Sequence, residues 1–230
     1  MPNQKFSLIT GKVFSAGGIT DTNDVVVWGK LPAYGGVGTA GKAVAPRLVA
    51  GGVKFKSLSI YHTVMCGISL ADDAYCWGNN ANNVMGNGAS GSIYATPQLV
   101  SGGLKFKSID ITPSTMCGVT TSNLLYCWGS NNNGLMGLGG QNYKFFVDTQ
   151  LTPVLAFGGM QVSKFIHVGG GQAICAVNSA DNKWYCAGDN SFGQLGNGIE
   201  SCQTGDAAFF QANGYCSDVV RSPYKILGQE

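Results

Sequence analysis

The cysteines have the clearest chemical potential in this sequence, because thiols form disulfides, bind metals and act as nucleophiles. Six of them fall in three pairs whose members are ten or eleven positions apart. The eight cysteines are Cys66, Cys76, Cys117, Cys127, Cys175, Cys186, Cys202 and Cys216. No Cys-x-x-Cys pair occurs, and the two histidines, His62 and His167, lie in unrelated positions. This spacing disfavours zinc, so we expect no metal and no cofactor and interpret the cysteines as structural.

Other reactive side chains form no recognisable catalytic group. Neither histidine lies beside a serine or cysteine motif, and His62 is interpreted as a surface turn residue. Asp72 and Asp73 fall in a predicted hairpin turn, where aspartate is favoured for turn geometry alone. Asparagine-rich segments at 79–83 and 131–133 could bind calcium, but turn formation is the preferred interpretation. We therefore predict no catalytic residues and no enzymatic activity.

Composition narrows the class of protein further. Glycine is abundant at 35 of 230 residues, and charged residues make up only 11%, against about 25% in average proteins. This combination is typical of short strands joined by tight turns. The net charge of +2 without a basic cluster disfavours nucleic-acid binding. No apolar run reaches the roughly 18–20 residues of a membrane-spanning helix, so membrane insertion is not expected.

An internal repeat supplies the elements that position the cysteines. The segment from Lys54 to Gly78 recurs without a gap from Lys105 to Gly129, and the segment from Lys5 to Gly29 aligns with both. A more divergent copy runs from Phe165 to Gly188. Each copy leads into a glycine-rich segment and closes with a proline five residues before a glycine. The sequence therefore predicts one repeat domain over 1–230, with repeats at about 1–52, 53–103, 104–159 and 160–230.

Each repeat is predicted to form four short strands. In the second repeat they are Lys56–Ile60, Val64–Ser69, Ala74–Trp77 and Gln98–Val100, with proline at the start of an edge strand. Trp28, Trp77 and Trp128 share one offset and are predicted to pack between repeats. In the fourth repeat Ala187 stands at that offset, and Trp184 is expected to fill the gap. The lysine pairs Lys54/Lys56 and Lys105/Lys107 are interpreted as solubilising strand ends.

The cysteine pairs lie on the second and third predicted strands of their repeats. The first repeat has Gly17 and Val27 at these positions, so both cysteines are missing together. Because facing residues on adjacent strands are within bridging reach, we pair Cys66–Cys76, Cys117–Cys127 and Cys175–Cys186. Cys202–Cys216 follows by elimination. Stable disulfides favour an oxidising compartment, so an extracellular or cell-surface location is expected. Residues 1–5 lack the apolar core of a secretory signal, so either a signal has been removed or the chain is part of a longer one.

The blocks MCG(I/V), YCWGxN and GxxGxG followed by proline resemble repeats of the regulator of chromosome condensation family. The resemblance covers essentially the whole chain and implies a β-propeller. The relatives of this family include a secreted bacterial β-lactamase inhibitor protein with the same kind of propeller. Members usually present protein-binding surfaces, and the founding member is an exchange factor for a small GTPase. Such propellers usually have about seven blades, whereas this chain offers four. We expect an all-β, disulfide-stapled array of four four-stranded blades, closed on itself or part of a larger or oligomeric ring.

Binding is predicted where the repeats differ, in the connections between third and fourth strands. Their aromatic residues could anchor a partner or could pack locally over the blades. They are Tyr34, Tyr94, Tyr143, Phe145, Phe146, Phe209, Phe210 and Tyr215. The leading hypothesis is a non-catalytic extracellular module that binds a protein or a glycan through these loops on one propeller face. The alternatives are a self-assembling structural protein, acting as a homo-oligomer, and an intracellular exchange factor or chromatin regulator.

Overall fold

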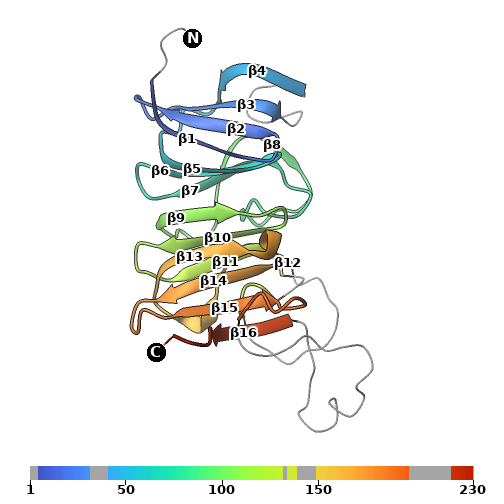
Figure 1. The fold of residues 1–230 in the computed structure, drawn as a ribbon. Helices are drawn as coiled ribbons and strands as arrows, with labels where there is room; N and C mark the ends of the chain where they lie inside the picture. Colours follow the sequence, from blue (N-terminus) through green and yellow to red (C-terminus); the bar gives the residue numbers. More distant parts are fainter. Residues whose placement is uncertain (1–4, 32–40, 132–133, 139–148, 197–218, 230) are drawn as a thin grey trace. The chain divides into compact units, whose positions relative to one another are not determined.

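The computed structural model describes residues 5–31, 41–131, 134–138, 149–196 and 219–229. Its strands form four four-stranded antiparallel sheets, each in strict chain order (Figure 1). Sheet 1 contains β1 (Phe6–Lys12), β2 (Ser15–Thr20), β3 (Val25–Leu31) and β4 (Gly41–Leu48). Sheet 2 contains β5 (Phe55–Tyr61), β6 (Val64–Ser69), β7 (Ala74–Asn79) and β8 (Ile93–Leu99). Sheet 3 contains β9 (Phe106–Ile111), β10 (Thr115–Thr120), β11 (Leu125–Ser130) and β12 (Thr149–Leu155). Sheet 4 contains β13 (Val162–Val168), β14 (Ala173–Asn178), β15 (Trp184–Asp189) and β16 (Val219–Lys225).

Two short 3-10 helices, η1 (Phe157–Gly159) and η2 (Gly169–Gly171), complete the described elements. No helix in these ranges has the length and hydropathy needed to cross a membrane. The all-β class and the four four-stranded sheets are confirmed, and each sheet falls inside one predicted repeat.

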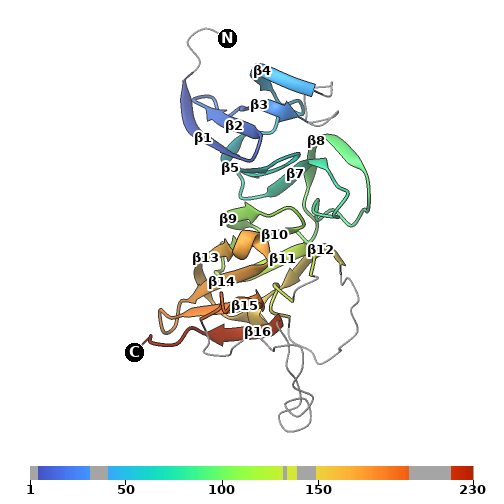
Figure 2. The same ribbon diagram turned by 45° about the vertical axis from the view of Figure 1, so that its right-hand side comes forward.

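The chain divides into two compact units. Unit 1 consists of residues 1–122, 126–130 and 149–154 and holds sheets 1 and 2 and most of sheet 3. Unit 2 consists of residues 123–125, 131–148 and 155–230 and holds sheet 4. Within unit 1 the sheets stack in chain order, as Figures 1 and 2 both show. The organisation as one domain stays a prediction.

Three of the predicted disulfides link strands that face each other across a hairpin. Cys66 is directly opposite Cys76, and the bonded pair has a Cα–Cα distance of 4.1 Å. The pairs Cys117–Cys127 and Cys175–Cys186 have the same Cα–Cα distance of 4.1 Å. A separation this short belongs to facing residues that exchange no backbone hydrogen bonds. Cys202 and Cys216 lie outside the described residues.

The predicted start of the fourth strand is wrong. In sheet 2 this strand begins at Ile93 rather than at Gln98, so that Pro97 lies inside it. The pairing jumps from Gly78↔Tyr94 to Cys76↔Gln98 and leaves a bulge that contains Pro97. Proline has no backbone N–H for the ladder, so a bulge on an edge strand accommodates it.

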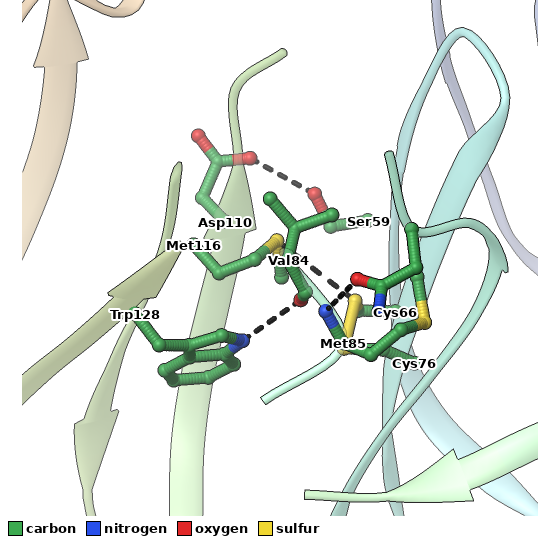
Figure 3. The surroundings of a disulfide bond; sticks show 9 residues. Ser59, Cys66, Cys76, Val84, Met85, Asp110, Met116 and Trp128 are labelled. Atoms are coloured by element: carbon green, nitrogen blue, oxygen red, sulfur yellow. Dashed lines mark hydrogen bonds between the residues drawn. A yellow bond between two sulfur atoms is a disulfide. The ribbon is translucent and has the colours of Figure 1, made fainter. Parts of the chain in front are cut away.

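Two apolar clusters join the three sheets of unit 1. Trp77 lies in the cluster between sheets 1 and 2, and Trp128 lies in the cluster between sheets 2 and 3. Both indoles are fully buried. The Trp128 Nε1 donates a hydrogen bond of 2.8 Å to the Val84 carbonyl, next to the Cys66–Cys76 disulfide (Figure 3). The prediction that these tryptophans pack between repeats is therefore confirmed.

Unit 2 fills the corresponding tryptophan position with a different residue from the one predicted. In sheet 2 a Cβ on Gly86 would lie 2.7 Å from the Trp128 indole. At the equivalent Gly137, a Cβ would lie 3.0 Å from the ring of Phe157. Phe157 is buried and holds a left-handed backbone with φ of 54°. Phe157 from η1 thus replaces the missing indole, and Trp184 instead lies half-buried beneath Lys164.

Lysines at the first strand of a repeat pair with aspartates in the preceding repeat. Lys54 Nζ lies 2.7 Å from Asp24, and Lys105 Nζ lies 2.7 Å from Asp73 at the equivalent offset. The interpretation of these lysines as purely solubilising is incomplete, and Asp73 does more than shape its turn. Sequence patterns miss such pairs because the partners are about 30 residues apart.

Candidate functional site

In every sheet, the first hairpin turn and the connection after the third strand start from the same ends of the strands. We call this end of a sheet its loop edge. A backbone hydrogen bond ties the two together in each repeat. Asn79 N–H donates to the Thr63 carbonyl at 3.0 Å, and Ser130 N–H donates to Ser114 at 2.7 Å. Gly78 precedes this bond, where a Cβ would overlap the Thr63 carbonyl oxygen. The close approach explains why glycine stands near the end of the third strand in all four repeats.

Asparagine side chains fix the loops at this edge. The Oδ1 of Asn80 accepts the backbone N–H of Met85 at 3.0 Å. Asn131 and Asn190, at the equivalent offsets, accept the N–H groups five residues ahead at 3.1 and 3.0 Å. These bonds support the turn interpretation of the asparagine-rich segments. Within the described ranges, no group of three or more histidine, cysteine or acidic side chains could hold a metal ion.

The loop of sheet 4 presents Phe192 to solvent with 92% of its surface exposed. The backbone around it is held by side chains of the same loop. Asp189 Oδ1 accepts the Ser191 N–H at 3.0 Å, and its Oδ2 accepts the Gln194 Nε2 at 2.8 Å. Gln194 Oε1 in turn accepts the Phe192 N–H at 2.8 Å. These hydrogen bonds thus fix the backbone of the loop, while the ring of Phe192 is exposed to solvent.

The turn between β1 and β2 presents a second aromatic residue at the loop edge, in unit 1. Phe14 is 64% exposed, and the neighbouring Val13 is 57% exposed. His62 meets Phe14 edge-on with 6.1 Å between the ring centroids, and Lys30 Nζ lies 5.7 Å from the Phe14 ring centroid. His62 is thus a turn residue, as expected, and it borders an exposed apolar group. Apolar side chains with one flanking ammonium are suited to binding rather than to proton transfer.

Of the eight aromatic residues predicted to bind a partner, only Tyr94 lies in the described ranges. It belongs to β8 rather than to the connection before it, because the strand begins at Ile93. It is half-buried and packs against the cluster between sheets 2 and 3. The other seven, namely Tyr34, Tyr143, Phe145, Phe146, Phe209, Phe210 and Tyr215, lie outside the described residues, so binding by them stays a prediction.

Sequence reasoning did not single out Phe14 or Phe192. Both stand where the aligned repeats have polar residues, since Phe14 aligns with Thr63 and Phe192 aligns with Asn82. An aromatic residue at an otherwise polar turn position was the available signal. Its exposure could not be read from the sequence.

Comparison with known proteins agrees with this geometry. Sequence profiles of the Regulator of chromosome condensation (RCC1) repeat match residues 106–135 and 122–177. These matches fall within sheets 3 and 4 of this chain. Human probable E3 ubiquitin-protein ligase HERC6 is 26% identical over 180 residues, which are 76% of this chain and 17% of that protein.

Solved structures show the RCC1-type propeller fold as well. Yeast RCC1 (Prp20), solved bound to Kap60, matches with a TM-score of 0.74 at 14% identity over 100% of this chain and 50% of its own. The CRINKLY WD40 ectodomain of the Arabidopsis thaliana receptor kinase ACR4 matches with a TM-score of 0.51 at 16% identity over 82% of this chain and 51% of its own. The chain thus spans about half the length of each of these two solved chains, and less than a fifth of HERC6.

Proposed function

We propose that this RCC1-type chain is a non-catalytic module that binds protein at the loop edges of its sheets, with Phe192 as an anchor in unit 2 and Phe14 as a separate anchor in unit 1. The observation that carries the proposal is Phe192, 92% exposed on a loop fixed by its own hydrogen bonds. Neither phenylalanine completes a core in the described part of the chain, because each lies more than half in solvent.

The energetics favour such residues as anchors. Burial of an exposed phenylalanine contributes about 1.5–3 kcal/mol, and aromatic residues are common among interface hot spots. Because the loop backbone around Phe192 is already ordered, a partner does not have to order it on binding. The ammonium of Lys30 next to Phe14 favours a partner that offers a carboxylate beside an apolar side chain.

A protein partner, rather than a glycan, agrees best with the relatives. Yeast RCC1 (Prp20), of the same fold, was solved in complex with Kap60. Exchange-factor activity and glycan binding stay predictions.

An extracellular or cell-surface location is part of the proposal. Its support is the three disulfides, since such bonds persist in oxidising compartments. The ACR4 structure is of an ectodomain, so the fold does occur outside cells. Counting free thiols in chain isolated from its native source tests the location, and six reactive thiols among these cysteines would contradict it.

The binding proposal is tested with a photo-crosslinking amino acid placed separately at Phe14, at Phe192 and at Leu70. Leu70 is a matched control, because it is 54% exposed but lies in the turn at the opposite edge of sheet 2. We expect one protein to be crosslinked in native extracts from positions 14 or 192 and not from 70. For that protein once purified, Phe192→Ala should lower the affinity roughly tenfold or more, with Leu70→Ala neutral. Equal crosslinking from all three sites, or crosslinks to glycan only, would reject the proposal.

A further inference from the structure

Two positions at the loop edge are joined by the same backbone hydrogen bond in every sheet. The first is the residue directly before the second strand, and the other is the residue after the glycine of the third strand; we call them the paired positions. In sheets 2, 3 and 4 both carry polar side chains, none of them basic. These pairs are Thr63 and Asn79, Ser114 and Ser130, and Gln172 and Asp189. In sheet 1 the pair is Phe14 and Lys30, so both members differ together.

The second paired position has a structural task elsewhere that lysine cannot perform. Asn79 and Asp189 each accept, through Oδ1, the backbone N–H two residues ahead, at 2.8 and 3.0 Å. Each of these side chains thereby closes the loop that follows it. An ammonium only donates hydrogen bonds, so Lys30 cannot make this contact. Its Nζ lies instead 5.7 Å from the centroid of the Phe14 ring.

The register of sheet 1 makes lysine costly at this position as well. Lys30 is paired with Lys42 across β3 and β4. The equivalent pair in sheet 2 is Asn79 and Ile93, which carries no charge. Like charges at facing positions of antiparallel strands destabilise the sheet. Departures of this kind from local consistency are typical of positions that serve function rather than the fold.

The charge of Lys30 is not neutralised within the described part of the chain. Lys30 is exposed, and no described carboxylate lies within ion-pair distance of its Nζ. By contrast, the Lys12 Nζ at the end of β1 lies 3.0 Å from Asp110 Oδ1. The acidic residues of the first repeat are Asp21 and Asp24, at the opposite edge of sheet 1. The loop edge of sheet 1 therefore presents an ammonium that a ligand can pair with.

An exposed apolar surface lies next to this ammonium. Phe14 is 64% exposed and Val13 is 57% exposed. The His62 ring of sheet 2 borders Phe14, with 6.1 Å between the ring centroids. A ligand that covers Phe14 with an apolar group thus brings a neighbouring charged group within reach of Lys30.

We propose that Phe14 and Lys30 together bind an extended peptide segment in which an acidic residue lies one or two positions from an apolar one. This inference rests on the proposed protein binding at the loop edge and specifies the chemistry that unit 1 recognises. The apolar side chain packs on Phe14, and the carboxylate pairs with the ammonium. The separation of 5.7 Å fits this spacing, because an extended chain advances about 3.3 Å per residue. A nucleic acid fits less well, since its binding depends on several cations together.

Selection from a peptide library displayed on phage, with the purified chain as the target, tests the proposal. Peptides enriched on the wild type should carry aspartate or glutamate one or two positions from a large apolar residue. On Lys30→Glu, lysine or arginine should take the place of the acidic residue, because the charge of the site is reversed. Lys5→Glu is the matched control, since it makes the same charge change at an exposed lysine at the other end of β1, and it should enrich the wild-type peptides. Failure to enrich acidic peptides, or equal enrichment on Lys30→Glu, would overturn the proposal.

Affinities of one enriched peptide, measured by fluorescence anisotropy, separate the two groups. Replacing its acidic residue by the amide should raise the dissociation constant roughly fivefold or more on the wild type and change it little on Lys30→Glu. Phe14→Ala should raise it roughly tenfold, with Leu70→Ala neutral. Lys30→Glu places a glutamate opposite Lys42 and should unfold no more readily in urea than the wild type. An amide peptide that binds the wild type as tightly as the acid would contradict the role of Lys30.

Two further outcomes are decisive. A single-stranded DNA oligonucleotide that binds more tightly than the peptide, and displaces it, would overturn the choice of a peptide ligand. A protein that is crosslinked from position 14 but binds Lys30→Glu as tightly as the wild type would overturn the preference for an acidic segment and leave the proposed function standing. Absence of crosslinks from positions 14 and 192 would instead overturn the proposed function itself.

Discussion

The two buried tryptophans of unit 1 allow the hydrogen bond between repeats to be measured against a matched control. Trp77 and Trp128 have the same repeat offset and are both fully buried. The Trp128 Nε1 donates to the Val84 carbonyl at 2.8 Å, whereas no described residue accepts from the Trp77 Nε1. Substitution of tryptophan by phenylalanine removes a similar volume at each position, but only at Trp128 does it also remove a hydrogen bond.

The expected magnitudes follow from these contacts. Loss of the larger ring from a closed core costs about 1–2 kcal/mol at either position. At Trp128 the abandoned Val84 carbonyl adds about 1–2 kcal/mol, because it is left buried without a donor. We therefore expect the free energy of unfolding to fall by about 3 kcal/mol in Trp128→Phe and by about 1–2 kcal/mol in Trp77→Phe.

Equilibrium unfolding in urea, followed by far-ultraviolet circular dichroism, gives both values without relying on indole fluorescence. The slopes of the transitions should agree among the wild type and the two variants, since similar surface is exposed on unfolding. An equal loss in both variants, or a larger loss in Trp77→Phe, would refute the role assigned to the Trp128 hydrogen bond.

Two further predictions concern contacts that the sequence did not reveal. Phe157→Ala should lower the free energy of unfolding by about 3–4 kcal/mol in the same urea assay, because it empties a buried site. A loss below about 0.5 kcal/mol, which is typical of surface positions, would show that the ring is not a core residue. Asp24→Asn should cost about 0.5–1 kcal/mol at pH 7, as expected for a screened ion pair. The hydrogen bond from Lys54 lowers the pKa of Asp24, so this stabilisation is complete above the unfolded value of about 4 and is lost as pH falls through the folded value. Stability curves against pH for the two proteins should therefore converge in acid, and a difference that persists there would contradict the ion-pair account.

The local pattern of the sequence was sufficient to predict the repeat and its strands. Alternating side chains and turn residues fix which strands pair, and cysteines ten or eleven positions apart then face each other across a hairpin. The pairing of Cys66 with Cys76 and the packing of Trp77 and Trp128 could therefore be predicted correctly. These features need only the periodicity of one repeat and its recurrence in the next.

The tertiary structure decided the features that depend on contacts between elements. Phe157 comes from a different segment than the tryptophan it replaces, and only the space above Gly137 shows that it fills the same site. The strand β8 begins earlier than its proline suggests, because a bulge absorbs the missing donor. Phe192 became a candidate anchor because its ring is exposed, and whether a ring is covered depends on the whole surrounding surface. The sequence of a repeat determines which residues pair within its sheet, but packing against neighbours determines which side chains are buried and which stay available to bind.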